Sequence, residues 1–568
     1  MRKTARWGAV GAVAAVIGAS LVLASGGVAN ATPNPSLAKN SHGHFSSGKA
    51  LPHVSSGAEV TFDEERAMGA DNTTAPDAPP DGTASALGCA NRGSSTNVRV
   101  NQDCTARRQA EEQVAVNPTD ATNVIAGQND SRVGFNHCGF DYSFDSGKTW
   151  GDGQPGFFQH LSAIGHTYDA ASDPAVTFSQ GGVAWFSCVM FDINSPATGL
   201  FVVPSTAGLK GAAYANVGAG ASKYVVAETA DNQTFFDKEF IAGDPNSNAV
   251  YVTFTKFLSS QKCSTKNNPG AYCSSEIFYS KWNGNAWSTP ANLSGTSSSL
   301  CTGGNTFDSK DAANACNFDQ GSYPTVLPNG DLYVVWNNGN TPTLVNQTLG
   351  RVVHPNGSMG PVVKVGKDDE SNLALCDFGR GPEECVSQIN VRTNDYPAVS
   401  VDPTNANHLV AVWQDTRLGS SNAKGQYDVV VSDSTDGGAT WSDATHAGGS
   451  VLPAPANGAL FEPSVAVTGA GRSVVTYYRA NAYTATDGMG TYGYGLQDRT
   501  TGASAFSAYV PLSDSQALAS PQGNAVQAGF LGDYSSVAAP TTGDSIHAVW
   551  ADTRNDLDQD VFIDNMTF

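Results

Sequence analysis

Short alternating apolar runs separated by turn residues recur along most of this chain. The stretch 396–442 shows the pattern most completely: the runs PAVSV and HLVAVW are separated by Asp402, Pro403, Asn405 and Asn407, and a third run, YDVVVS, follows. Alternation with a period of two predicts β-strands, and clusters of Pro, Asp and Asn predict the turns between them. The stretch therefore predicts antiparallel strands joined by short connections.

A similar phrase, in which an acidic or aromatic residue leads into a short apolar strand and a turn, begins at seven places along the chain. These starts are Glu112, Asp173, Glu239, Tyr323, Tyr396, Glu462 and Tyr534. Repetition of one supersecondary unit predicts sheets that stack and bury a shared core. No charge-rich helical pattern accompanies the repeats, and 60 glycines fit a chain with many turns. We therefore expect an all-β chain of seven units, with six as the alternative.

One octet is more specific than the rest of the pattern. It reads Ser143-Phe-Asp145-Ser-Gly147-Lys-Thr149-Trp150 and returns as Ser434-Thr-Asp436-Gly-Gly438-Ala-Thr440-Trp441. A Ser and an Asp two residues apart can accept hydrogen bonds from the backbone amides of a tight turn. The Gly supplies the positive φ that such a turn needs, and the Trp ring packs against it. Each octet therefore predicts a self-capped hairpin turn.

These octets resemble the Asp-box repeats of sialidase-like β-propellers, in which the box closes the turn between the third and fourth strands of a blade. The resemblance implies a propeller of four-stranded blades for residues 89–568 and makes the octet residues structural. It also implies a glycan or glycoconjugate as ligand, with an exo-acting, sialidase-like glycoside hydrolase as the leading activity. A non-catalytic glycan- or protein-binding scaffold is the alternative. Sialidases have six blades and an Arg-Ile-Pro phrase that this chain lacks, so no catalytic residue is assigned from the family.

The last unit ends one strand short of four. Its strands are predicted at SIHAVWAD and DVFIDNMTF, after which the sequence stops at Phe568. A sheet with a missing strand exposes an unpaired edge. We expect the segment NVRVNQ, which begins at Asn97, to supply that strand and to join the two ends of the ring.

The N-terminus has the form of a secretory signal peptide. A basic start, MRKTARWG, precedes an apolar run and ends in Ala29-Asn-Ala31, which predicts a signal over residues 1–31. Residues 32–88 are rich in Ser, Gly, Pro and Ala and predict a flexible leader. The sequence has no second long apolar run, so we expect a secreted, extracellular protein without a membrane anchor.

The net charge of the chain limits the classes of partner that we expect it to bind. The net charge is −21, and removal of the basic signal residues makes it more negative. Such an acidic surface disfavours nucleic acid and anionic membranes as partners. No cofactor is expected. A calcium ion at Asp556, Asp558 and Asp560 is weighed against a solvated acidic loop, which is the favoured interpretation.

Ten cysteines in an exported chain predict disulfides, and no C-x-x-C spacing points to zinc. Pairing of sequence neighbours would join Cys89 to Cys104, Cys138 to Cys188, Cys263 to Cys273, Cys301 to Cys316, and Cys376 to Cys385. Other pairings stay open, because connectivity does not follow from spacing alone.

Strand direction sorts the candidate binding residues onto one face. If the octet turns join strands three and four at one end of each unit, strand one begins and strand two ends at the other. Carboxylates at starts of strand one are Glu112, Asp173, Asp237, Glu239, Asp395, Glu462 and Asp533. Second strands end in Asp130-Ser-Arg132, Asp415-Thr-Arg417 and Asp552-Thr-Arg554, with Arg479 at an equivalent place. We expect these groups to surround one mouth of a central channel.

Both groups of residues have a structural alternative. The arginines could clamp a carboxylate ligand, or each could bond an Asp of its own unit, such as Asp428 for Arg417 and Asp560 for Arg554. The carboxylates could serve as acids and bases with raised pKa values, or they could cap backbone amides at the channel.

Overall fold

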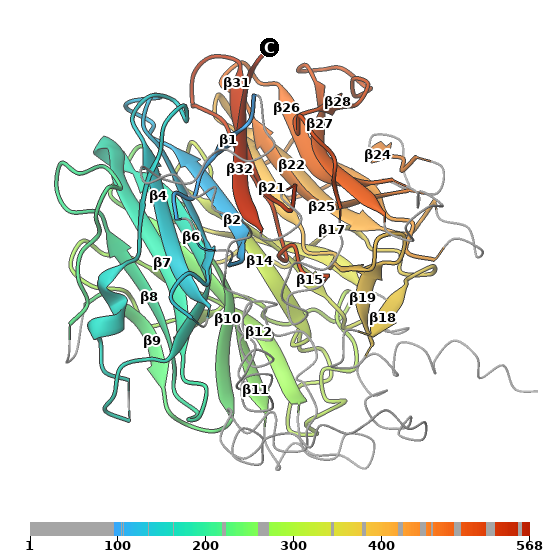
Figure 1. Cartoon of the computed structure of the whole chain (residues 1–568). Helices are drawn as coiled ribbons and strands as arrows, with labels where there is room; N and C mark the ends of the chain where they lie inside the picture. Colours follow the sequence, from blue (N-terminus) through green and yellow to red (C-terminus); the bar gives the residue numbers. More distant parts are fainter. Residues whose placement is uncertain are drawn as a thin grey trace, which may run out of the picture.

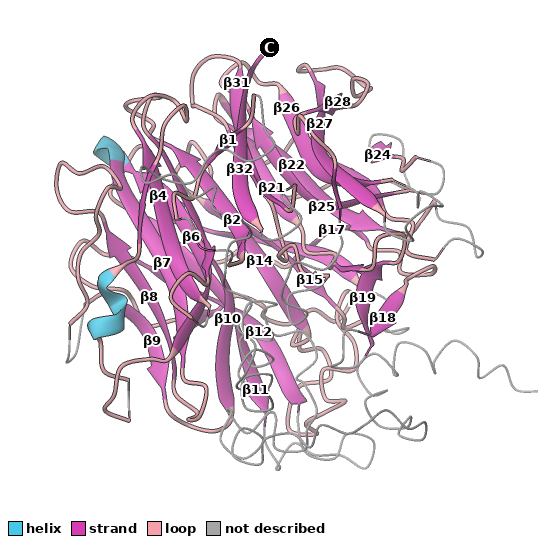
Figure 2. Ribbon diagram, in the orientation of Figure 1, coloured by secondary structure: helices cyan, strands magenta, loops and turns pink. Residues whose placement is uncertain are grey.

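The structure is a computed structural model in which nearly every regular element is a β-strand (Figures 1 and 2). It describes residues 96–103, 105, 107–134, 136–162, 164–218, 223–259, 272–341, 346–377, 382–418, 424–442, 450–455, 458–481, 490–518, 529–554 and 559–568. The predicted signal and leader lie outside these residues. Within them, the only helical elements are two 3-10 turns, η2 (Gly156–Gln159) and η3 (Gln180–Gly182). No helix in the described part of the chain is long and apolar enough to span a membrane.

The strands form antiparallel sheets that follow one another along the chain. The first sheet contains β2 (Gln109–Val116), β3 (Val124–Asp130), β4 (His137–Ser143) and β5 (Gly151–Gly153). The second contains β6 (Ala170–Ser179), β7 (Val183–Phe191), β8 (Thr198–Pro204) and β9 (Val225–Thr229). The third contains β10 (Thr234–Gly243), β11 (Val250–Ser259), β12 (Tyr272–Lys281) and β13 (Ala291–Asn292). The fourth contains β14 (Asp319–Val326), β15 (Leu332–Asn338), β16 (Gln347–Val353) and β17 (Val363–Lys367).

The later sheets keep the same order. The fifth contains β21 (Ala398–Asp402), β22 (Asn405–Asp415), β23 (Asp428–Ser434) and β24 (Ser450–Leu452). The sixth contains β25 (Ala459–Val467), β26 (Ser473–Ala480), β27 (Thr491–Arg499) and β28 (Val510–Pro511), with β29 (Ala517–Leu518) also paired to β27. The seventh contains β30 (Ser536–Ala538), β31 (Ser545–Asp552), β32 (Asp560–Thr567) and β1 (Val98–Arg99). A separate three-stranded sheet, absent from the sequence prediction, contains β18 (Leu375–Asp377), β19 (Pro382–Val386) and β20 (Val391–Arg392).

The N-terminal strand pairs with the C-terminal one, as the segment NVRVNQ predicted. In β1, Val98 lies opposite Ile563 and Arg99 lies opposite Phe562, both of β32. This pairing covers the edge of β32 that the last unit would otherwise expose.

The first strands of the seven larger sheets are neighbours in space. Each of β2, β6, β10, β14, β21 and β25 contacts the first strand of the next sheet, and β30 contacts β2. The sheets are thus arranged as in a propeller-like fold, with one strand of each sheet innermost. Sequence-distant groups at equivalent ends of these strands are brought together.

The core lies between facing sheets, so the middle strands are buried on both sides. In β22, the run from Leu409 to Asp415 is buried throughout. Its Trp413 packs in one cluster with Tyr333 and Val335 of β15, and a β-carbon at Gly366 of β17 would overlap the Trp413 ring. Burial on both faces explains why this strand reads as an almost continuous apolar run.

The two octets form the capped turns that their spacing predicts, each between the third and fourth strands of a sheet. After β23, the Ser434 hydroxyl accepts a hydrogen bond from the amide of Gly438 at 2.8 Å, and Asp436 accepts from the amide and hydroxyl of Thr440 at 2.8 and 2.6 Å. Gly438 has φ 87°, and the Trp441 indole N–H donates to its carbonyl. The same set of bonds follows β4, with Ser143, Asp145, Gly147, Thr149 and Trp150 in these places.

Three of the predicted neighbour disulfides are present: Cys138–Cys188, Cys301–Cys316 and Cys376–Cys385. The first joins β4 to β7 and so links two adjacent sheets. Cys273 is also disulfide-bonded, but Cys263, Cys89 and Cys104 lie outside the described residues. Three disulfides fit an extracellular protein.

Candidate functional site

A bulge recurs near the start of the innermost strands. The register shifts in the first half of β2, β6, β10, β14 and β25. In each case the first bulged residue has a positive φ, and these residues are Glu111, Asp173, Lys238, Gly321 and Glu462. Four of the five are not glycine, although a left-handed backbone disfavours side chains other than those of Gly, Asn and Asp. A bulge that re-aims a side chain is a common device beside functional sites.

Tyr396 and Tyr534 occupy the position of the first bulged residue in the two remaining large sheets. Each stands two residues before the first strand-paired residue, Ala398 or Ser536, just as Asp173 stands two before Ala175. Seven equivalent positions therefore carry, in chain order, Glu111, Asp173, Lys238, Gly321, Tyr396, Glu462 and Tyr534. We refer to these residues as the channel ring.

Lys238 is the centre of the channel ring. Its ammonium group is fully buried, pairs with Asp533, and lies 3.9 Å from Oε1 of Glu111. It also lies over the aromatic rings of Tyr396 and Tyr534, at 5.3 and 5.9 Å from their centroids. Burial alone would lower the pKa of this lysine, but the surrounding carboxylates raise it well above its usual value. Lys238 is therefore a permanent buried cation.

A second cation approaches the same carboxylate from the small sheet. The guanidinium of Arg392 in β20 bonds Asp533 Oδ1 at 2.8 Å and Glu383 Oε2 at 2.6 Å. Asn394 donates to both Asp533 Oδ1 and the Asp533 carbonyl at 3.0 Å. The three-stranded sheet thus completes the site.

Glu111 and Asp173 lie close enough for the charge of Asp173 to act on the Glu111 carboxyl. Asn129 of β3 bridges them, because its amide donates to Glu111 and its carbonyl oxygen accepts from the Asp173 backbone at 2.9 Å. Burial and then the Asp173 charge raise the pKa of Glu111 well above its usual range. Burial and a neighbouring negative charge both favour the protonated form of a carboxyl, so Glu111 is protonated more easily than an exposed glutamate.

Several carboxyls in the channel ring or beside it have no hydrogen-bond partner among the described residues. Both oxygens of Glu112, Glu239 and Glu462 are buried and unbonded. Burial is the main cause that raises the pKa of each well above its usual range. The phenol of Tyr534 is also unbonded, and its raised pKa keeps it neutral. Carboxyl groups of this kind can donate protons near neutral pH, whereas the Tyr534 phenol keeps its proton.

The channel ring can be approached beside Tyr396. Gln320, Asn394 and Tyr396 are half-buried, whereas Lys238, Glu111 and Glu239 are fully buried. The Tyr396 hydroxyl donates to Gln320 Oε1 at 2.7 Å, and its ring lies where a β-carbon at residue 321 would be, which explains Gly321. A ligand would meet this amide and phenol before the buried charges.

A further acidic group adjoins this approach. Oxygens of Asp368, Glu370 and Asp395 all lie within 4.8 Å of one another, as the ligands of an oxygen-coordinated cation do. Asn337 donates to Asp368 and Asn346 donates to Asp395, each at 3.2 Å. Burial and the Asp395 charge raise the pKa values of Asp368 and Glu370 well above their usual range.

The opposite end of the channel has different chemistry. A cavity of about 440 Å³ lies between the later halves of the innermost strands. Its lining includes Val176, Val399 and Val465, with prolines where the strands end, such as Pro245 and Pro403. The lining of this cavity contains no charged residue, in contrast to the channel ring.

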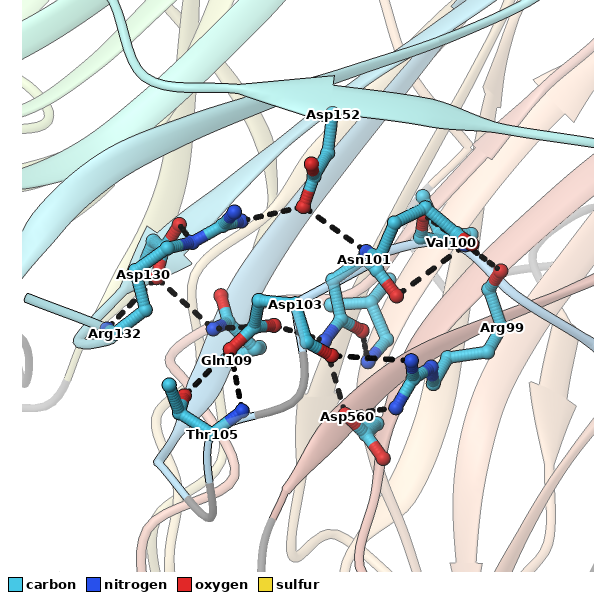
Figure 3. Close-up of polar contacts among 12 residues, drawn as sticks. Arg99, Val100, Asn101, Asp103, Thr105, Gln109, Asp130, Arg132, Asp152 and Asp560 are labelled. Atoms are coloured by element: carbon cyan, nitrogen blue, oxygen red, sulfur yellow. Dashed lines mark hydrogen bonds and ion pairs between the residues drawn. The ribbon is translucent and has the colours of Figure 1, made fainter. Parts of the chain in front are cut away.

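The arginines of the repeated tripeptides bond within their own neighbourhood. Arg132 pairs with Asp130, two residues earlier, and with Asp152 Oδ2 at 2.7 Å (Figure 3). Both partners belong to the first sheet, and Asp130 also accepts from Gln109 at 3.0 Å. The same picture shows Arg99 of β1 beside Asp560 of β32, at 3.5 Å.

Arg417 and Arg554 follow the same scheme with different partners from those named as the structural alternative. Arg417 Nη2 pairs with Asp415 at 2.6 Å, not with Asp428. Arg554 pairs with Asp552 at 2.5 Å and Asp514 at 2.6 Å, not with Asp560. The reason is local: the chain turns back directly after the Asp, so the nearest acceptor is two residues away. Arg479 instead lies over the ring of Tyr509, 4.6 Å from its centroid.

The predicted binding residues thus fall into two groups. Asp237, Glu239, Glu462 and Asp533 meet at the channel ring together with Asp173, and Asp395 lies next to it. Asp130, Asp415, Asp552 and the four arginines lie at the ends of second strands. Asp556 and Asp558 lie outside the described residues.

Sequence reasoning missed Lys238, Glu111 and Arg392. Lys238 stands between Asp237 and Glu239, two residues that were selected, but the selection considered acidic groups only. The signal that could have identified Lys238 was its spacing, because it precedes the apolar run of its unit by the same distance as the acidic residues of other units. Arg392 had no such signal, because its small sheet lies outside the repeat.

No protein-family profile and no curated protein matches this chain. Among solved structures, a Dyadobacter fermentans protein of unknown function matches with 10% identity over 83% of this chain and 97% of that chain, at a TM-score of 0.40. The Hadza microbial sialidase Hz136 matches with 11% identity over 78% and 73%, at 0.39. The Penicillium chrysogenum alpha-L-arabinanase matches with 11% identity over 69% and 92%, at 0.37. Similarities at this level assign the chain to no family.

Proposed function

We propose that the protein is a secreted seven-bladed β-propeller that binds carbohydrate at the charged mouth of its channel. The blade number is supported by the seven innermost strands that contact one another in turn. The pairing of β1 with β32 supports a ring joined by its N-terminal strand. Export follows from the signal sequence and fits the disulfides.

The observation that carries this proposal is the gathering of buried, unbonded carboxyl groups at one end of the channel. Glu239 and Glu462 have four such oxygens between them, and each lacks a donor among the described residues. Unbonded buried acceptors are costly, and a ligand with many hydroxyl donors would satisfy them. Sugars are ligands of that kind. The proposed ligand-binding residues are Asp237, Glu239, Asp395, Glu462 and Asp533. We propose that the pairs Asp130–Arg132, Asp415–Arg417 and Asp552–Arg554, together with Arg479, surround them.

Glycoside hydrolysis is the leading activity for this set. The reaction needs one carboxyl that is protonated at working pH and a second group that acts as base or nucleophile. The raised pKa of Glu239 suits the acid. Tyr534 lies close enough to Glu111 for the charge of that carboxyl to act on the phenol, so Glu111 is the glutamate proposed to accept the Tyr534 proton.

A binding scaffold without catalysis is the second candidate. The observation that favours it is the pairing of Arg132, Arg417 and Arg554 with aspartates two residues away. Guanidiniums held in this way are less available to clamp a ligand carboxylate.

Incubation with chromogenic glycosides, including a sialoside, and binding to a glycan array test both candidates. Glu239→Gln and Tyr534→Phe are the site variants. Asp331→Asn is the matched control, because Asp331 lies in an exposed turn beyond β14, away from the channel ring, and bonds His354. Turnover that the site variants lose and the control keeps supports the hydrolase. Glycan binding without turnover supports the scaffold, and neither turnover nor binding overturns the proposal.

A further inference from the structure

The second sheet departs from the Asp–Arg scheme at the end of its second strand. The strands β3, β22 and β31 end in an Asp whose partner is the Arg two residues later. In β7 the residue in register with these aspartates is Met190, and Asp192 stands two positions later, where the other three sheets carry the Arg. Asp192 is fully buried, yet it has no arginine. Its charge must therefore be balanced in another way.

Two side chains from the start of the same sheet face Asp192. The Nε2 atom of His166 lies 3.1 Å from Asp192 Oδ2. Asp169 completes the group, and its carboxylate also accepts from the Ile193 amide at 3.0 Å. One donor atom from each of the three residues lies within 4.8 Å of the others. One imidazole nitrogen and two carboxylate oxygens form a mixed donor set.

The proton of His166 is placed so that Nε2 presents a lone pair. Its Nδ1 lies 2.6 Å from the Thr167 carbonyl, which can only accept, so Nδ1 carries the hydrogen. In the neutral ring Nε2 then has no proton and points at a carboxylate. An imidazole that donates its other N–H to a carbonyl is the usual arrangement of a metal-bound histidine.

The carboxylate of Asp192 provides an independent sign of a ligand. Its Oδ2 accepts from the Ser195 hydroxyl at 2.6 Å, which fixes its orientation. Its Oδ1 is buried and accepts no hydrogen bond from the described residues. A buried carboxylate oxygen without a donor is a site that a cation satisfies.

We propose that His166, Asp169 and Asp192 bind a divalent transition-metal ion of the zinc class at the end of the second sheet. Imidazole nitrogen favours zinc and its neighbours over calcium or magnesium, and three protein ligands leave a position for water. The His166 side chain is 46% exposed, so the ion can reach the site from solvent.

Titration calorimetry with Zn²⁺ on the metal-stripped exported chain tests this site. His166→Gln removes the nitrogen ligand at an exposed position, so folding is retained. His354→Gln is the matched control, because His354 is 45% exposed and pairs with Asp331 at 2.9 Å but belongs to no three-ligand group among the described residues. Differences between these variants also cancel any zinc bound by histidines elsewhere in the chain.

We expect wild type and His354→Gln to bind one Zn²⁺ at this site, and His166→Gln to bind it at least tenfold more weakly. Zn²⁺ should also raise the thermal midpoint of the first two proteins and not that of His166→Gln. The proposal is overturned if His166→Gln binds zinc as tightly as wild type, or if no saturable binding occurs in any of them. Either result would identify the His166–Asp192 contact as an ordinary ion pair.

Discussion

Removal of the Lys238 charge tests the physical account of the channel ring most directly. In Lys238→Met the side chain keeps its length, but Asp533 and Glu111 lose the ammonium group that they share. All three side chains are buried, so solvent cannot replace the lost cation. Asp533 keeps Arg392, whereas Glu111 keeps only neutral partners beside the Asp173 carboxyl. The uncompensated charge should therefore rest mainly on Glu111.

The distance sets the size of the effect. Two unit charges 3.9 Å apart attract by about 4 kcal/mol at an effective dielectric constant of about 20. Removing one partner of a buried ion pair typically costs about 3–5 kcal/mol. Lys238→Met should lower the free energy of unfolding at neutral pH by that amount. Lys210→Met, which removes an exposed pair with Asp120 at 2.9 Å, should cost less than about 1 kcal/mol.

Urea denaturation at two pH values measures both the loss and its cause. The pKa of Glu111 in the folded protein lies above its unfolded value, so its protonation stabilises the fold. That stabilisation is complete below the unfolded pKa and is lost as the pH rises through the folded pKa. Loss of Lys238 raises the folded pKa further, so the deficit of Lys238→Met should shrink as the buffer is acidified.

The double variant Lys238→Met, Glu111→Gln should recover a large part of the stability, because a neutral amide needs no counter-ion. The reasoning is refuted if Lys238→Met unfolds at the wild-type urea concentration at neutral pH. It is equally refuted if the deficit does not depend on pH and Glu111→Gln restores nothing.

Three further predictions concern the frame around the site. Replacing Cys138 and Cys188 together by Ser opens a loop of 50 residues and should cost about 4 kcal/mol in chemical denaturation, whereas an unchanged midpoint would mean that the bridge adds nothing to the packed sheets. Asp436→Ala removes the acceptor of both Thr440 hydrogen bonds and should lower the thermal midpoint. Hydrogen bonds hold the pKa of Asp436 below its usual value, so the difference from wild type should fade as the pH drops through the folded pKa. Deleting residues up to Gln102 removes β1, and size-exclusion chromatography should show self-association through the exposed edge of β32, while a monomer of wild-type stability would contradict this role.

Much of the fold could be predicted because it depends on short-range signals. The octets at Ser143 and Ser434 determine a turn within eight residues, and the turn residues around Pro403 separate two strands on their own. Pairing of the segment at Asn97 with the last unit followed from counting strands. The small sheet from β18 to β20 could not be predicted in this way, because it repeats nothing else in the chain.

The candidate site was predicted only in part, for a reason that lies in the backbone. Selecting acidic residues at starts of strands identified Asp237 and Glu239 but passed over Lys238 between them. A regular strand turns such neighbours to opposite faces, whereas the bulge places an extra residue at the channel. Bulges follow from contacts with neighbouring sheets, and no local sequence pattern in this chain predicts them.

The arginines show the opposite limitation. Their tripeptide repeats clearly, so sequence reasoning selected Arg132, Arg417 and Arg554 as a set of binding residues. The motif recurs, however, because each sheet uses it for a local ion pair. Each of these arginines balances the Asp two residues before it. The more informative place is the second sheet, where the motif is missing and the buried Asp192 stands at the position of the Arg.

The same contrast applies to the channel ring. The apolar positions of the seven units are alike because each must fill the same space between sheets. At the ring, equivalent backbone positions carry Glu, Asp, Lys, Gly, Tyr, Glu and Tyr, and four of the non-glycine residues have left-handed backbones. A purely structural plug would be met by one residue type repeated at these positions. The seven positions are instead filled by five residue types, the buried lysine among them, and form a single composite group. The unbonded oxygens of Glu462 in the ring and of Glu239 beside it are where a polar ligand would complete that group.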